Sequence, residues 1–130
     1  MINHVIFDWQ GVLEQIGGLN GQLIDWIKEN EDNYEFSILT NCPGDFSQKL
    51  KKIGLENIFK TVVNPENRFI RKPQKEAYQT LLEEVGRTPD ECLFIDDSAT
   101  NVQAAKSLNI ESFLYQSNKD LFNKFKEKGL

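Results

Sequence analysis

The sequence predicts an α/β fold of the doubly wound class, with a five-stranded parallel sheet flanked by helices. Two observations lead to this prediction. Five short runs of β-branched and aromatic residues are each followed by a stretch in which apolar residues recur at helical spacing, and this alternation is typical of parallel sheets. The chain has 130 residues, which suffices for one hydrophobic core and leaves little room for a second. We therefore expect a single Rossmann-like domain spanning residues 1–130.

The expected strands are residues 5–7, 34–39, 61–63, 92–95 and 113–115. Each run is too short for a helix. The apolar faces of the five expected helices are formed by Leu19, Leu23, Trp26 and Ile27; by Phe46, Leu50 and Ile53; by Ala77, Leu81 and Val85; by Val102, Ala105 and Leu108; and by Leu121, Phe122 and Phe125. Gly54, Gly86 and Asn109 are expected to end helices, and Ser117 to cap the last one.

The composition argues against several classes of protein. Fifteen basic and 20 acidic residues give a net charge of −5, which is unfavourable for general nucleic-acid binding. No apolar run approaches the ~18–20 residues that span a bilayer, and the first residues lack a signal-peptide pattern. Cys42 and Cys92 lack metal-ligand spacing. We therefore expect a soluble cytoplasmic protein without membrane association.

Polar residues follow three of the expected strands. Asp8 follows the first strand, Thr40 the second, and Asp96 and Asp97 the fourth, while Lys72 precedes the third helix. Because the carboxyl ends of parallel strands share one edge of a sheet, these side chains are expected on one rim, with Lys72 reaching it from a loop.

Such a group of side chains is suited to phosphoryl transfer. Three carboxylates on one rim repel one another, and a hard divalent cation, typically Mg²⁺ where phosphate is bound, removes that repulsion. A carboxylate then attacks, the metal and an ammonium neutralise the equatorial oxygens, and a hydroxyl positions the phosphoryl group. Any one of these residues alone is more often a turn former or helix cap, by roughly three to one. The functional interpretation depends on their occurring together.

The residues resemble the haloacid dehalogenase (HAD) superfamily, most of whose members are Mg²⁺-dependent phosphohydrolases that work through an aspartyl-phosphate. The resemblance covers nearly the whole chain. The four family motifs are similar to residues 5–13 (VIFDWQGVL), 39–41 (LTN), 71–73 (RKP) and 94–105 (FIDDSATNVQAA). The last stretch is the most specific. The family's sheet order would place the first strand between the second and the fourth, which brings the motifs together.

The resemblance implies a role for each matching residue. Asp8 would be the nucleophile and Thr40, Asn41 and Lys72 the phosphate-binding residues, with Lys72 neutralising charge. Asp8, the carbonyl of Gln10, and Asp97 would bind Mg²⁺. Asp96 would either join the metal site or hold Lys72. Asn101 occupies a position where the family often has an acidic residue.

Two departures from the family pattern affect the predicted function. Gln10 stands where phosphatases of this family carry a second Asp that protonates the leaving group, and loss of such help commonly costs about 10²–10⁴ in rate. The intervals from Asp8 to Thr40 and from Thr40 to Lys72 are each 32 positions, too short for the usual cap domain. A turn at residues 16–18 stands where relatives carry a helical cap. The open site favours bulky or macromolecular phosphoesters, or cover by a second subunit.

Four functions are therefore considered. The first is a Mg²⁺-dependent phosphohydrolase weakened or altered at Gln10, acting on a phosphorylated small molecule or bulky phosphoester. The second is a catalytically silent module that binds metal and phosphate and has a regulatory role. A receiver domain ranks low because its acidic pair precedes its other site residues in the chain. Dehalogenation by Asp8 ranks low because it leaves the acidic pair without a metal to bind.

Other polar residues have weaker functional signals. Arg68 and Arg71 flank Lys72 and would add positive potential for an anionic substrate, although solvated loop charges are equally expected. His4 lies at the far end of the first strand, and Cys42 has no base beside it in the sequence. A catalytic thiol is therefore not expected.

Overall fold

Five parallel strands form one sheet, and the first strand of the chain lies at its centre. The computed structural model describes residues 1–66 and 69–130. The strands are β1 (His4–Phe7), β4 (Glu35–Leu39), β5 (Phe59–Val63), β6 (Cys92–Asp96) and β7 (Glu111–Leu114), in the order β5-β4-β1-β6-β7. This arrangement confirms the predicted fold class and the position of β1 between β4 and β6.

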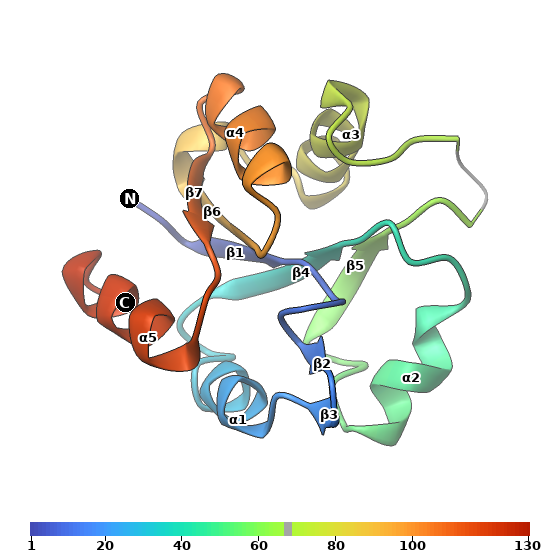
Figure 1. Cartoon of the computed structure of the whole chain (residues 1–130), viewed down its shortest axis with the longest axis vertical. Helices are drawn as coiled ribbons and strands as arrows, with labels where there is room; N and C mark the ends of the chain where they lie inside the picture. The colour runs from blue at the N-terminus through green and yellow to red at the C-terminus, as the bar shows by residue number, and fades with distance from the viewer. Residues whose placement is uncertain (67–68) are drawn as a thin grey trace.

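Helices cover both faces of the sheet. They are α1 (Gly21–Glu29), α2 (Phe46–Lys52), α3 (Lys75–Val85), α4 (Ala99–Ser107) and α5 (Asn118–Glu127), with a short 3₁₀ turn at Pro89–Glu91. In Figure 1, α1, α2 and α5 lie on one side of the sheet and α3 and α4 on the other. Two apolar clusters match these layers, because one includes Leu23, Leu50 and Phe125 and the other Tyr78 and Ala105.

A small hairpin follows β1 and leaves the sheet. It consists of β2 (Glu14–Gln15) and β3 (Gly18–Leu19), which pair antiparallel around a turn at residues 16–17. Leu19 was predicted to begin the first helical face, and this prediction is wrong. Leu19 belongs to β3 and is exposed, whereas α1 begins at Gly21 after Asn20, whose side chain caps the helix by accepting a hydrogen bond from the Leu23 amide.

The predicted helix ends agree closely with the structure. Gly54 and Gly86 both have positive φ and follow α2 and α3, and Ile53, the C-cap of α2, packs against the same apolar cluster as Phe46 and Leu50. Asn109 has a φ of 65° just after α4, and Ser117 caps α5 by accepting a hydrogen bond from the Asp120 amide. These helix ends therefore have the local causes that the sequence indicated.

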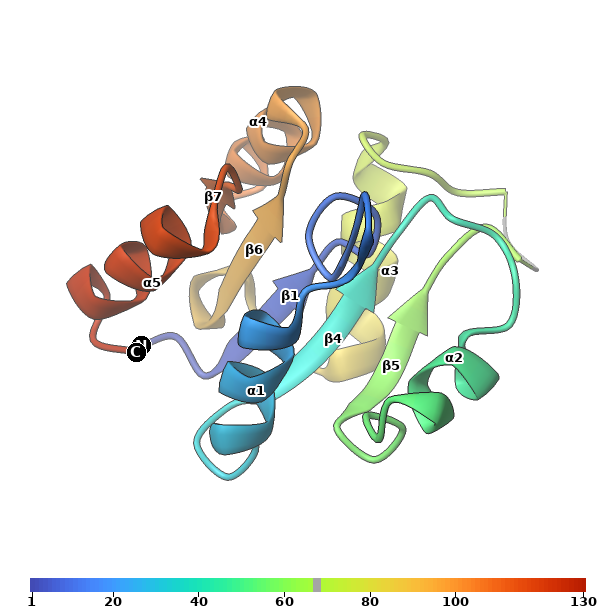
Figure 2. The ribbon, with the colours of Figure 1, turned by 60° about the horizontal axis from the view of Figure 1, so that its bottom comes forward.

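All five strands point the same way, so the segments that follow β1, β4 and β6 lie at one end of the sheet (Figure 2). The described residues contain no inserted cap domain, and the hairpin β2–β3 is the additional element at this end. No helix among residues 1–66 and 69–130 is long and apolar enough to cross a bilayer. Because the strands are parallel, the predicted site residues lie together in the loops at the carboxyl end of the sheet.

The opposite end of β1 holds a buried histidine. His4 is 2% exposed, and its Nε2 lies 2.8 Å from the hydroxyl of Ser37. Burial lowers the pKa of His4 below 6.5, although the Glu35 carboxylate, 3.5 Å from Nδ1, opposes the shift. The folded protein thus favours the neutral imidazole more than the unfolded chain does.

This shift predicts a loss of stability in mild acid. Below pH 6.5 the unfolded chain takes up a proton on His4 more readily than the folded protein, so the free energy of unfolding falls as the pH drops through this range. Urea unfolding at pH 7.5 and pH 5.5 measures the effect. We expect the pH-dependent loss to be smaller in His4→Gln, which cannot titrate; an equal loss in both proteins would contradict the assignment.

Candidate active site

The predicted site residues line one hollow at the carboxyl end of the sheet. Its volume is about 330 Å³. Its walls come from the ends of β1, β4 and β6 and from the loop before α3. The lining residues are Asp8, Gln10, Gly11, Thr40, Asn41, Cys42, Lys72, Asp96, Asp97, Ser98 and Asn101. The structure therefore brings together all seven residues predicted to form the site, and their chemical roles stay predictions.

Lys72 joins two of the carboxylates. Its Nζ donates to Oδ1 of Asp8 at 2.8 Å and to Oδ2 of Asp96 at 2.7 Å. The Lys72 side chain is 1% exposed, so the pairs form largely out of water. Hydrogen bonds between ionised groups are among the strongest in proteins, and this bridge ties the loop before α3 to the ends of β1 and β6.

Asn41 holds the backbone of Lys72. The Lys72 amide donates to Oδ1 of Asn41 at 2.8 Å, and Nδ2 of Asn41 donates back to the Lys72 carbonyl at 3.0 Å. The loop before α3 is thus tied to the end of β4, which directs the lysine side chain into the site. The sequence predicted a phosphate-binding role for Asn41 and did not indicate this positioning contact.

Thr40 presents a hydroxyl to the hollow from the end of β4. Its Oγ1 accepts a hydrogen bond from the amide of Cys42 at 3.1 Å, and the residue is 2% exposed. Because this bond uses an oxygen lone pair, the hydroxyl hydrogen stays available to an anion. The geometry is compatible with the predicted phosphate-positioning role.

The two adjacent acidic residues differ in environment. Asp96 is fully buried, and besides Lys72 it accepts hydrogen bonds from the Ser98 amide and from Nδ2 of Asn101. Asp97 is exposed at the rim. Of the two alternatives predicted for Asp96, the structure shows that it holds Lys72, and its carboxylate also lies close to those of Asp8 and Asp97.

Gly11 allows the turn after β1 to approach Asp97. Its φ is +87°, which side chains of L-residues rarely tolerate, and an added Cβ would lie 2.0 Å from Oδ2 of Asp97. The glycine therefore leaves room for the carboxylate over the hollow. No role was predicted for Gly11 from the sequence, although its place in the first motif could have indicated one.

Gln10 lies in a tight turn between β1 and the hairpin. The carbonyl of Trp9 accepts hydrogen bonds from the amides of residues 12–14, and the Gly11 amide donates to the Glu14 carbonyl. Gln10 itself is exposed and lines the hollow. Its position therefore depends on the turn and hairpin rather than on the sheet.

The carboxylates are costly to ionise without a counter-charge. Burial raises the pKa of Asp8 to about 7, with Lys72 opposing and Asp96 reinforcing the shift. Burial, followed by the charge of Asp96, also raises the pKa of Asp97. A divalent cation would relieve both penalties.

The donor set fits Mg²⁺. One carboxylate oxygen each from Asp8, Asp96 and Asp97 lie within 4.8 Å of one another. Magnesium prefers oxygen ligands and is typically held by one or two carboxylates together with water and phosphate oxygens. Because Asp96 already accepts three hydrogen bonds, Asp8 and Asp97 are better placed to act as direct ligands.

The remaining polar residues lie away from this chemistry or on its margin. Arg71 is exposed, and Arg68 lies outside the described residues. Cys42 lines the hollow, whereas burial raises the pKa of the Cys92 thiol to about 12, as expected of a core residue. His4 contributes to a different pocket.

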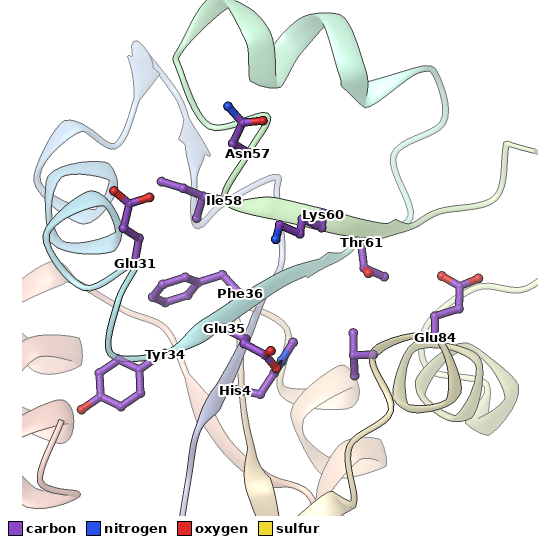
Figure 3. A pocket seen from close by; sticks show the side chains of 11 residues that line it. His4, Glu31, Tyr34, Glu35, Phe36, Asn57, Ile58, Lys60, Thr61 and Glu84 are labelled. Atoms are coloured by element: carbon purple, nitrogen blue, oxygen red, sulfur yellow. Dashed lines mark ion pairs between the residues drawn. The ribbon is translucent and has the colours of Figure 1, made fainter.

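That second pocket, of about 260 Å³, lies at the amino ends of β4 and β5 (Figure 3). It is lined by residues that include His4, Tyr34, Phe36, Ile58 and Lys60. Because the amino and carboxyl ends of parallel strands are opposite, His4 lies at the far end of the sheet from Cys42 and does not serve as a base for its thiol. This agrees with the expectation from sequence.

A model of the family described as haloacid dehalogenase-like hydrolase matches residues 14–115. The match includes Thr40, Lys72, Asp96 and Asp97, while Asp8 and Gln10 precede it. The phosphoglycolate phosphatase of Colwellia psychrerythraea is 28% identical over 80 residues, which are 61% of this chain and 35% of that protein. That of Pseudomonas putida is 28% identical over 87 residues, 66% of this chain and 31% of that protein. The chain spans about a third of the length of these curated relatives.

Solved structures share the fold. A HAD family enzyme from Bacteroides thetaiotaomicron, in complex with magnesium and inorganic phosphate, has a TM-score of 0.78 at 16% identity, covering 96% of this chain and 100% of that one. A HAD phosphatase from Thermococcus onnurineus has a TM-score of 0.74 at 24% identity, covering 86% of this chain and 59% of that one. At these identities the likeness concerns the architecture.

The electrostatics of the hollow predict opposite effects of Asp97→Asn with and without metal. In the presence of a chelator, Asp97→Asn removes a negative charge that the folded protein disfavours, so its melting temperature should lie above that of the wild type. Mg²⁺ at 100 times its dissociation constant should stabilise the wild type by about 2.7 kcal/mol and the variant much less. Thermal unfolding with Asp25→Asn, on the exposed face of α1, provides the control. An equal Mg²⁺ effect in both variants would show that Asp97 is not a ligand.

Proposed function

The chain belongs to the haloacid dehalogenase-like hydrolase family, and within it we propose a Mg²⁺-dependent phosphohydrolase that cleaves phosphomonoesters through an aspartyl-phosphate on Asp8. One observation carries this proposal. Asp8 lies at the end of the central strand, bonded to the ammonium of Lys72 and grouped with Asp97 around a space suited to a cation. A nucleophile, a charge-neutralising group and metal ligands thus share one hollow.

The reaction would proceed in two displacements. A carboxylate oxygen of Asp8 attacks phosphorus as the bond to the leaving oxygen breaks, while Lys72 and the Thr40 hydroxyl stabilise the phosphoryl oxygens. Mg²⁺, held by Asp8, Asp97 and the carbonyl of Gln10, would supply positive charge for the phosphoryl group. Water then attacks the aspartyl-phosphate, releasing phosphate and a proton and regenerating the Asp8 carboxylate.

Gln10 determines which substrates are hydrolysed efficiently. An amide transfers no proton at neutral pH, and no His or Glu lies among the described residues that line the hollow. Asp8, Asp97 and Lys72, which do line it, act in this proposal as nucleophile, metal ligand and charge-neutralising group. The leaving oxygen must therefore depart as an anion or take its proton from solvent. Aryl phosphates should react faster than alkyl phosphates. Phosphoglycolate, the substrate in the names of the curated relatives, is an alkyl phosphate and belongs to the slower class.

The open site favours large substrates. Gln10 and Asp97 are exposed, and the described residues supply no cap over the hollow. We propose a phosphorylated small molecule or a bulky phosphoester as substrate, with a second subunit as an alternative source of cover. The net charge of −5 disfavours general nucleic-acid binding, and the two free cysteines accord with a cytoplasmic location.

A second candidate is a catalytically silent module with the same fold. Gln10 favours it, because the binding groups are kept while the proton-transfer group is absent. Such a module would bind Mg²⁺ and inorganic phosphate in calorimetry and hydrolyse none of a broad panel of phosphoesters. The two experiments below separate it from the enzyme.

Replacing the nucleophile tests the enzyme directly. We expect slow hydrolysis of p-nitrophenyl phosphate by the wild type with Mg²⁺, and a fall to the background rate in Asp8→Asn, because an amide does not attack phosphorus. The release of p-nitrophenolate measures the rate. Asp25→Asn is the matched control and should leave it unchanged. Undiminished turnover by Asp8→Asn would refute catalysis through this residue.

Restoring a carboxylate at position 10 tests the missing proton transfer. We expect Gln10→Asp to raise turnover by up to about 10²–10⁴, most strongly for alkyl phosphates, whose leaving groups need protonation. Gln10→Asn has nearly the same shape as the aspartate and should give no gain. Rates for matched aryl and alkyl phosphates distinguish the two. If neither variant gains activity while both bind Mg²⁺ and phosphate, the silent module is the better description.

A further inference from the structure

A polar cluster at the base of the hairpin lies outside the chemistry described above. It consists of Gln15, Asn20, Tyr115 and Asn118, and we call it the hairpin clamp. Asn20 and Asn118 form a reciprocal amide pair, each donating from Nδ2 to the other's Oδ1 at 2.8 Å. The Tyr115 hydroxyl accepts from Nε2 of Gln15 at 3.0 Å and donates to Oδ1 of Asn118 at 2.8 Å.

The clamp reaches the turn that carries Gln10. Nδ2 of Asn20 lies 3.0 Å from the carbonyl of Val12, and the Asn20 amide donates to the carbonyl of Leu13 at 2.9 Å. Both residues belong to the turn whose amides converge on the Trp9 carbonyl. Asn20 is 5% exposed, so its bonds replace contacts with water and are costly to break.

The clamp also reaches the acidic side of the hollow. Tyr115 follows β7, and its amide donates to the carbonyl of Asp96 at 2.8 Å. One residue thus contacts the backbone of Asp96 through its amide and the base of the hairpin through its hydroxyl. Its two contacts connect the two sides of the hollow, one carrying Gln10 and the other carrying Asp96 and Asp97.

We propose that the hairpin clamp positions Gln10 for the reaction, with Tyr115 and Asn118 as positioning residues rather than catalytic ones. This inference rests on the proposed function. Gln10 is exposed and follows the last residue of β1 by three positions, so the sheet does not fix it. Hydrogen bonds from the far end of the chain restrict the turn instead and hold Gln10 in the wall of the hollow.

Two single variants each remove part of the clamp. Tyr115→Phe deletes only the hydroxyl, and Asn118→Ala deletes the amide pair. Tyr34→Phe is the matched control, because Tyr34 stacks on Trp26 at the other end of the sheet. The measurements are amide hydrogen exchange, Mg²⁺ binding by calorimetry, and kcat and KM for p-nitrophenyl phosphate.

The clamp predicts a local effect. In Tyr115→Phe and Asn118→Ala, exchange at residues 10–20 should rise about tenfold while exchange in β1 and β4 stays at the wild-type level. Mg²⁺ affinity should fall, and kcat should fall about tenfold with KM nearly unchanged, because misplacement weakens alignment more than binding. The double variant should lose little more than either single one, since both act through one network.

Three results would overturn the inference. Exchange at residues 10–20 that stays at the wild-type level would show that the clamp does not restrain the turn. Faster exchange with unchanged Mg²⁺ affinity and kcat would show that it only stabilises the fold. The same changes in Tyr34→Phe would show a non-specific effect. Exchange and Mg²⁺ binding need no substrate, so an inactive wild type would refute the proposed function alone and leave these two measurements to judge the clamp.

Discussion

The ammonium of Lys72 between Asp8 and Asp96 is the interaction on which the rest of the site depends. It is buried, so removing one partner leaves an uncompensated charge, which typically costs about 3–5 kcal/mol. The same contact ties the loop before α3 to the carboxylates that follow β1 and end β6. The balance of charge among Asp8, Lys72 and Asp96 therefore links three segments that are distant in the sequence, and the site is assembled when they fold together.

Sequence alone predicted that Asp8, Thr40, Asp96 and Asp97 meet, because parallel strands place their carboxyl ends on one edge and three of the strands are followed by recognisable polar residues. Gln10 and Asn41 were assigned through the family resemblance. That resemblance assigned Asp97 to the metal and left Asp96 open between the metal site and Lys72, since only packing decides which carboxylate is buried. The hairpin was seen only as a turn, because strands of two residues show no periodicity. The pairing of Asn20 with Asn118 spans 98 positions and leaves no local signal.

The site combines parts of unequal rigidity. Asp8 and Thr40 end strands that are buried within the sheet, and their geometry is set by backbone pairing with both neighbours. Gln10 belongs to a turn and hairpin outside the sheet. The position at which this chain departs from the usual family residue is thus also the position least determined by the common fold. A substitution at position 10 therefore leaves the packing of the core intact.

The two outer strands have a consequence for assembly. β5 and β7 have five and four residues, and Lys60 on β5 and Glu111 on β7 place charges along them. Glu111 is further engaged by an ion pair with Lys128. Short, charged borders of this kind discourage a neighbouring chain from continuing the ladder of backbone hydrogen bonds.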